Sequence, residues 1–165
     1  MDKQRFWQLI EQSKINGSEC EQQSEQLTEL LSQLQAEEII EFDKHFTQCS
    51  DESYRWDLWA VAYIIHGGCS DDGFDYFRGW LIAQGQEFFE QVMANPERAA
   101  DRVEPEEVAE CEEIDYAASQ AYEKVTGKEL PAADYHRQRS KEPIGEEWEE
   151  ESVEEIYPVL WQKYA

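Results

Sequence analysis

Residues 56–85, WDLWAVAYIIHGGCSDDGFDYFRGWLIAQG, decide the fold of this chain. Large apolar side chains are concentrated here, and the few charges mixed with them include a single arginine, Arg78. The stretch 55–66 is apolar nearly all round, which predicts a buried helix that other helices cover. Gly67-Gly68 then stops this helix, because glycine readily takes the left-handed conformation at a helix end.

The next helix begins at Ser70, a residue type that caps helix N-termini. Asp71 and Asp72 follow in its first turn, where carboxylates suit the positive end of the helix dipole. Gly85 ends the second helix. We therefore expect a tight helical hairpin at residues 55–85 in the centre of the fold.

Apolar residues at helical spacing continue on both sides of the hairpin, and no convincing strand pattern appears. The sequence therefore predicts an all-α fold, with residues 1–165 forming one domain of about seven helices. The predicted apolar stripes are Phe6, Trp7 and Ile10; Leu27, Leu30, Leu31 and Leu34; Ile39, Phe42 and Phe46; Phe88, Phe89 and Val92; Cys111, Ile114, Ala118, Tyr122 and Val125; and Val153, Ile156, Tyr157, Leu160, Trp161 and Tyr164.

Glycine and proline mark the expected helix ends. Asn16-Gly17 should end the first helix. Pro105 is predicted to open a long helix that runs to Thr126, because proline suits the first helical turn. Residues 131–148 are predicted to be a polar loop, and Pro158 should kink the helix that follows.

The charge is strongly acidic, with 38 Asp and Glu against 14 Lys and Arg and a net charge of −24. Such a field repels nucleic acids and anionic lipids, so we expect neither direct nucleic-acid binding nor membrane binding. It favours a basic protein as partner, although solubility alone is the simpler interpretation. The longest apolar run is too short for a bilayer, and the opening residues MDKQRFWQLIEQ are unlike a secretory signal. We therefore expect a soluble, cytoplasmic protein.

The four cysteines are Cys20, Cys49, Cys69 and Cys111. They form no C-x-x-C pair, so no zinc site is expected from their spacing. In a reducing cytosol such residues are ordinarily buried free thiols.

The hairpin contains the candidate functional residues. Arg78 lies among apolar neighbours and needs a partner if it is buried. Asp75 lies three residues earlier on the same helix, and Asp57 lies on the preceding one. The structural interpretation is a buried ion pair that fixes the register of the hairpin.

The functional interpretation places His66, Asp71, Asp72 and Arg78 around the Gly67-Gly68 turn. Free backbone N–H groups at a helix start suit an anion, but the two aspartates oppose one. A divalent cation suits the aspartates, but adjacent carboxylates without further ligands are a weak signal. His66 at a helix C-terminus is more often a structural cap than a base. We therefore expect no metal and no cofactor.

Two other acidic groups invite interpretation. Glu106, Glu107, Glu110, Glu113 and Glu123 lack the histidines of a carboxylate-bridged metal site and indicate a solvated face. Seven glutamates surround Trp148 between residues 146 and 155. Such a stretch can dock on a basic partner, although a solvated helix start is the simpler interpretation.

The 56–85 segment resembles the hallmark of a bacterial family known only as a domain of unknown function. The stretches MDKQRFWQLI, ECEEIDYAASQAYEKVTGKELP and GEEWEEESVEEIYPVLWQKY extend the resemblance over nearly the whole chain. It implies a short, stand-alone protein, and it supplies no activity, ligand or catalytic residue.

The chain contains no recognisable nucleophile elbow, catalytic triad or phosphate-binding loop. We therefore expect a non-catalytic interaction module, for example an inhibitor or immunity-type binder of a basic protein. The alternatives are an enzyme or small-ligand protein with its site at Gly67-Gly68, and a structural subunit. The sequence leaves the oligomeric state open.

Overall fold

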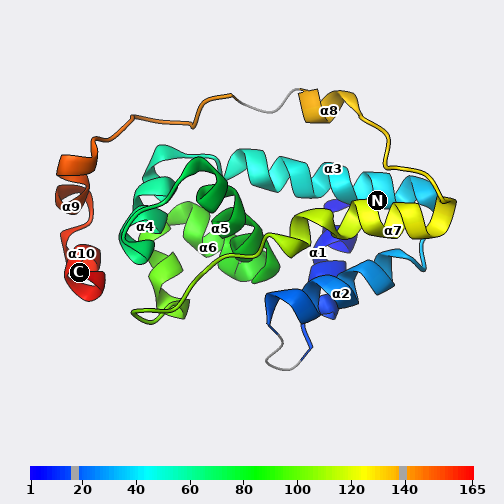
Figure 1. Ribbon diagram of the computed structural model, residues 1–165, viewed down its shortest axis with the longest axis horizontal. Helices are drawn as coiled ribbons and strands as arrows, with labels where there is room; N and C mark the ends of the chain where they lie inside the picture. The colour runs from blue at the N-terminus through cyan, green and yellow to red at the C-terminus, as the bar shows by residue number, and fades with distance from the viewer. Residues whose placement is uncertain (16–18, 138–140) are drawn as a thin grey trace.

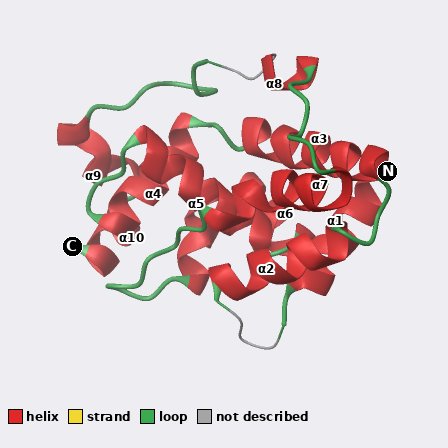
Figure 2. Ribbon diagram, turned by 45° about the vertical axis from the view of Figure 1, so that its right-hand side comes forward, coloured by secondary structure: helices red, strands yellow, loops and turns green. Residues whose placement is uncertain are grey.

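The computed structural model describes residues 1–15, 19–137 and 141–165, and these residues form helices without a strand (Figures 1 and 2). The all-α prediction is confirmed. The described residues form ten α-helices, several of only one turn, in place of about seven. The α-helices are α1 (Lys3–Ser13), α2 (Cys20–Leu31), α3 (Ala36–Glu52), α4 (Trp56–His66), α5 (Asp71–Ala83), α6 (Gln86–Ala94), α7 (Ala117–Thr126), α8 (Asp134–Arg137), α9 (Val153–Ile156) and α10 (Pro158–Tyr164). The 3₁₀ helices are η1 (Pro96–Arg102), η2 (Glu113–Tyr116) and η3 (Glu150–Ser152).

The helices form two neighbouring groups (Figure 1). In one group α2 and α3 pack against α7, and α1 packs against α2. In the other, α4, α5 and α6 lie together, and the C-terminal chain crosses back from α8 to place α9 and α10 beside α4. None of the helices in the described ranges is long and apolar enough to cross a membrane. The helix end predicted at Asn16-Gly17 lies outside the described residues.

The predicted boundaries between α4 and α5 are confirmed. Gly67 has the left-handed φ of 66°, and the N–H of Gly68 bonds to the carbonyl of Tyr63 at 2.9 Å. The hydroxyl of Ser70 accepts the N–H of Gly73 at 3.1 Å and so caps α5. Glycine conformation and a hydroxyl cap thus act at these two ends as the sequence predicts.

The tight pairing of α4 with α5 in a hairpin is not confirmed. The two helices are joined by a short turn, but α4 packs mainly against η1 and α10, whereas α5 packs mainly against α3, α6 and η2. The composition of α4 explains this arrangement, because an apolar helix needs cover on several sides. Its buried residues are Leu58, Ala60, Val61, Ala62, Ile64 and Ile65.

The long helix predicted from Pro105 to Thr126 is wrong, because α7 begins only at Ala117. Pro105 lies in a turn in which the N–H of Glu107 bonds to the carbonyl of Glu104, and Glu106 has a φ of 75°. Between this turn and η2 the chain lies against neighbouring elements and forms no helix. Tertiary contacts outweigh the local helix propensity of this segment.

These contacts are specific hydrogen bonds and one covalent bond. The N–H of Cys111 bonds to the carbonyl of Tyr76 on α5 at 2.8 Å. The carbonyl of Cys111 lies so close to Gly79 that an added Cβ would be 2.6 Å away. Cys111 also forms a disulfide with Cys20 on α2. The prediction of four free thiols is therefore wrong for this pair, which spacing alone does not reveal because 91 residues separate the two cysteines.

The segment predicted as a polar loop, residues 131–148, contains the short helix α8 and specific long-range contacts, while residues 138–140 lie outside the described residues. Tyr135 donates its hydroxyl to Asp43 of α3 at 2.6 Å, and burial together with this bond raises the pKa of Tyr135. Further on, Ile144 forms a bridge with Arg55. The predicted break at Pro158 is present, since it separates α9 from α10.

Gly79→Ala should destabilise the protein by about 1–3 kcal/mol, because its Cβ would overlap the backbone of Cys111. Gly73→Ala on the same helix is the matched control. Its Cβ meets only ordinary contacts, so the gain in helix propensity should stabilise the fold by about 0.5–1 kcal/mol. Urea unfolding measures both, and equal effects at the two positions would contradict the close approach at Gly79.

Reduction of the disulfide should lower the free energy of unfolding by about 2–4 kcal/mol, because an unfolded chain without the cross-link gains conformational freedom. Urea unfolding with and without dithiothreitol measures the effect. The double variant Cys20→Ser, Cys111→Ser should be as unstable as the reduced protein and insensitive to reductant. An unchanged midpoint for the reduced wild type would refute the cross-link.

Candidate functional site

Arg78 is enclosed, with only 2% of its surface exposed. Its guanidinium forms an ion pair with Asp75 and donates to the carbonyl of Ser50 at 2.7 Å. It also lies over the rings of Tyr54 and Phe74, with its Cζ atom 4.5 and 4.8 Å from their centroids. Arg78 therefore connects the end of α3, the segment before α4 and its own helix α5.

Of the two carboxylates predicted as partners for Arg78, Asp75 forms the ion pair. The side chain of Asp75 is 43% exposed, so the charge of this pair is only partly removed from water. Asp57 instead pairs with Arg55, with Nη2 and Oδ2 2.5 Å apart. Arg55 also donates to the carbonyl of Met93 at 2.9 Å and so ties the start of α4 to the end of α6.

His66 connects the end of α4 to the segment before η2. Its Nδ1 lies 2.9 Å from the carbonyl of Ala62, and its Nε2 accepts the N–H of Ala109 at 3.1 Å. This pattern requires a neutral imidazole with its proton on Nδ1. Both ring nitrogens are thus used within the chain, which is the geometry of a structural bridge.

Asp71 and Asp72 lie in the exposed first turn of α5. Asp71 accepts the hydroxyl of Tyr54 at 3.1 Å, and Tyr54 in turn contacts Arg78. Near the turn at Gly67-Gly68, Asp71, His66 and Arg78 thus each contact a different partner within the chain. That the candidate residues also form a functional cluster stays a prediction; these residues are Asp57, His66, Asp71, Asp72, Asp75 and Arg78.

The two free cysteines lack the environment of a nucleophile. Burial raises the pKa of Cys69 to about 12, with a smaller contribution from Glu110. Burial likewise raises the pKa of Cys49 to about 12, and Glu52 adds to it. Both side chains are therefore protonated at neutral pH, and a thiol is a much weaker nucleophile than a thiolate.

One group of metal-ligating side chains occurs in the described part of the chain, formed by Cys20, Cys111 and Glu113. Their ligand atoms lie within 4.8 Å of one another. The disulfide occupies both sulfur atoms, which removes the two thiolates that a metal ion would need. In the oxidised protein this group is a cross-link beside a carboxylate.

The sequence did not predict that Trp148 docks on α4. Its indole N–H donates to the carbonyl of Trp56 at 2.7 Å. Its ring meets Trp56 and Trp59 nearly at right angles, at centroid distances of 6.0 and 6.4 Å, and Tyr63 at 5.3 Å. A tryptophan within an acidic run indicates a buried or docking side chain, but the sequence does not reveal its partner, which lies 92 residues earlier in the chain.

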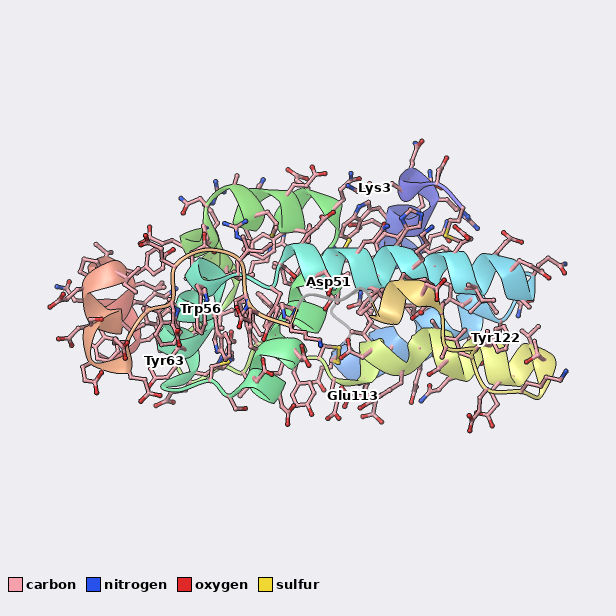
Figure 3. The ribbon with its side chains drawn as sticks, turned by 90° about the horizontal axis from the view of Figure 1, so that it is seen from above. Lys3, Asp51, Trp56, Tyr63, Glu113 and Tyr122 are labelled. Carbon is pink, nitrogen blue, oxygen red and sulfur yellow. A yellow bond between two sulfur atoms is a disulfide. The ribbon has the colours of Figure 1, made fainter. Side chains whose placement is uncertain are left out.

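A cavity of about 370 Å³ lies where the acidic run crosses α4. We name it the aromatic–acidic cavity. Its ring-bearing walls are Trp56, Trp59, Tyr63 and Trp148. Its acidic rim comprises Glu147, Glu149, Glu150 and Glu151. Figure 3 places Trp56 and Tyr63 together on α4, where the C-terminal chain passes, far from Glu113 and Tyr122.

Two larger cavities have linings of mixed chemical character. One, of about 830 Å³, shares Trp148 with the aromatic–acidic cavity and is also lined by Arg55, Asp57 and Ile156. The other, of about 490 Å³, borders the disulfide and contains Arg102 beside Glu107 and Glu110. Neither combines several aromatic rings with charge of one sign, as the aromatic–acidic cavity does.

A comparison with family models matches residues 1–124 of the chain. The chain belongs to the family described as Protein of unknown function (DUF4240). The resemblance seen in the sequence is therefore confirmed for residues 1–124, which end within α7, whereas the final quoted stretch, residues 145–164, lies beyond the matched region. Searches of curated proteins and of solved structures found no match. The DUF4240 match identifies no activity, ligand or functional residue.

Arg78→Met should destabilise the protein by about 2–4 kcal/mol, because the part-buried carbonyl of Ser50 loses a charged donor and the contacts of the guanidinium that join α3 to α5 are removed. Asp75→Asn should cost less than about 1 kcal/mol, since its side chain is partly solvated. Urea unfolding of both variants measures this difference. A nearly neutral Arg78→Met would contradict a structural role for the guanidinium.

Proposed function

We propose that this DUF4240 protein is a non-catalytic interaction module that binds a basic protein through its acidic C-terminal segment. The observation that carries the proposal is the fixed position of residues 146–155 on α4. The hydrogen bond from Trp148 and the bridge at Ile144 hold this segment against the start of α4. Its glutamates therefore form an acidic surface that needs little further ordering on binding.

Electrostatics supports the same partner. The net charge of −24 attracts a basic protein over a distance and accelerates its encounter with this chain. Such attraction is screened by salt, so association should be strongest at low ionic strength. An inhibitor or immunity-type role, in which the acidic surface covers a basic functional site, is one form of this proposal.

The residues at the Gly67-Gly68 turn favour a non-catalytic role over an enzyme or small-ligand site. Arg78 is enclosed by its contacts, and both nitrogens of His66 bond within the chain. The nearby Cys69 is a protonated thiol. A catalytic acid, base or nucleophile needs a reactive atom within reach of substrate, which these contacts do not favour.

Affinity capture from a cytosolic extract of the source cells, at low salt, tests the proposal. The immobilised wild type should retain a basic protein that is released in about 0.5 M salt, where charges are screened within a few ångströms. The rim variant Glu149→Gln, Glu150→Gln, Glu151→Gln should lose most of it.

The control variant Glu25→Gln, Glu123→Gln, Glu129→Gln removes the same number of charges from exposed positions elsewhere. It should retain the partner as the wild type does. Equal loss in both variants, or no basic protein retained by the wild type, would refute binding through the C-terminal segment.

A further inference from the structure

The aromatic–acidic cavity has a chemistry more specific than an acidic surface. We propose that it is an arginine-binding site, which takes the guanidinium group of an arginine side chain on the partner. This inference rests on the proposed function, since it names the group by which a basic protein would be recognised. It follows from the rings, from the carboxylates and from a second guanidinium site in the same molecule.

The rings form a continuous row that ends at the cavity. Phe74 stacks on Trp59, with centroids 5.0 Å apart and planes 12° from parallel. Trp59 stacks in turn on Trp56, at 5.2 Å and 8°. Trp148 stands nearly perpendicular to both indoles. We call Phe74, Trp59 and Trp56 the aromatic row.

Phe74, which stacks on Phe77 as well as on Trp59 and is the one ring of the aromatic row that does not line the cavity, already holds a guanidinium. Arg78 lies over Phe74, with Cζ 4.8 Å from the ring centroid, while Asp75 supplies its carboxylate. Trp56, at the other end of the row, lines the cavity and meets carboxylates again. The protein thus combines an aromatic ring with acidic groups at both places, and fills the first of them with its own arginine.

The carboxylates favour a cation that donates hydrogen bonds. Four glutamates line the cavity, and this described lining contains no lysine or arginine. These glutamates are exposed, and because like charges that line one cavity repel one another, a cation bound among them lowers the electrostatic energy. An anion is excluded by the same field.

The indole N–H groups of Trp148 and Trp59 are engaged elsewhere. Trp148 donates to the carbonyl of Trp56, and Trp59 donates to the carbonyl of Cys69 at 2.9 Å. Trp59 is stacked between Phe74 and Trp56, so the aromatic surface left for a ligand is chiefly that of Trp56, Tyr63 and Trp148, while the glutamates present acceptors. A planar guanidinium satisfies both, because it stacks on aromatic faces and donates five hydrogen bonds in its plane. A trimethylammonium group stacks but donates none, and a lysine head donates but is not planar.

Titration with defined peptides tests the assignment. The probe is an acetylated, amidated seven-residue glycine peptide with arginine at its centre, and the matched peptides carry citrulline, lysine or trimethyllysine there. Binding is followed by the indole N–H resonances of the ¹⁵N-labelled full chain. The arginine peptide should shift the resonances of Trp56, Trp59 and Trp148, and leave that of buried Trp7 in place.

Citrulline keeps the shape of arginine without its charge, so its peptide should bind at least about tenfold more weakly. The rim variant of Glu149, Glu150 and Glu151 should weaken arginine binding by a similar factor. The control variant of Glu25, Glu123 and Glu129 should stay within about twofold of the wild type, because it loses the same three charges as the rim variant but at positions that do not line the cavity. Arginine binding no tighter than citrulline, or lysine or trimethyllysine binding as tight as arginine, would overturn the assignment.

The two proposals fail separately. If the peptides do not bind but the captured basic protein still depends on the rim glutamates, the arginine site is wrong and the proposed function stands. If the arginine peptide binds selectively but no basic protein is captured, the site stands and the proposed partner is wrong.

Discussion

The arrangement of the helices depends on the contacts that the buried guanidinium of Arg78 makes. A full positive charge lies among aromatic rings, where it is stable only because several groups converge on it. The carbonyl of Ser50, the rings of Tyr54 and Phe74, and the carboxylate of Asp75 come from α3, from the connection to α4 and from α5. Their common contact with one side chain fixes how these three segments meet, which apolar packing alone specifies less sharply.

The sequence predicted the features that depend on neighbouring residues. Gly67 and Ser70 mark helix boundaries because backbone conformation and capping are local properties. Asp75 is one of the two partners that the sequence predicts for Arg78, because residues three apart share a helix face, and it is the one that forms the ion pair. The all-α fold followed from the same periodicity.

The features that the sequence did not predict depend on partners distant in the chain. Local signals at Pro105 favour a helix, but the bonds from Cys111 to Tyr76 and Cys20 hold that segment in another conformation. Trp148 stands out locally as a tryptophan in an acidic run, but its partner Trp56 lies 92 residues earlier in the chain. The aromatic–acidic cavity was missed for the same reason, since one wall comes from α4 and the rim from residues near the C-terminus.

The C-terminal chain, which lies beyond the end of the family match, covers part of α4. The aromatic row lies within residues 1–124, whereas Trp148 and α10, which cover α4, lie outside them. A polypeptide confined to the matched region would expose the indoles of Trp56 and Trp59 more fully to water. Exposed apolar patches of this kind promote self-association. The segment that completes the cavity therefore also covers aromatic surface of α4 that the matched region by itself would leave open to water.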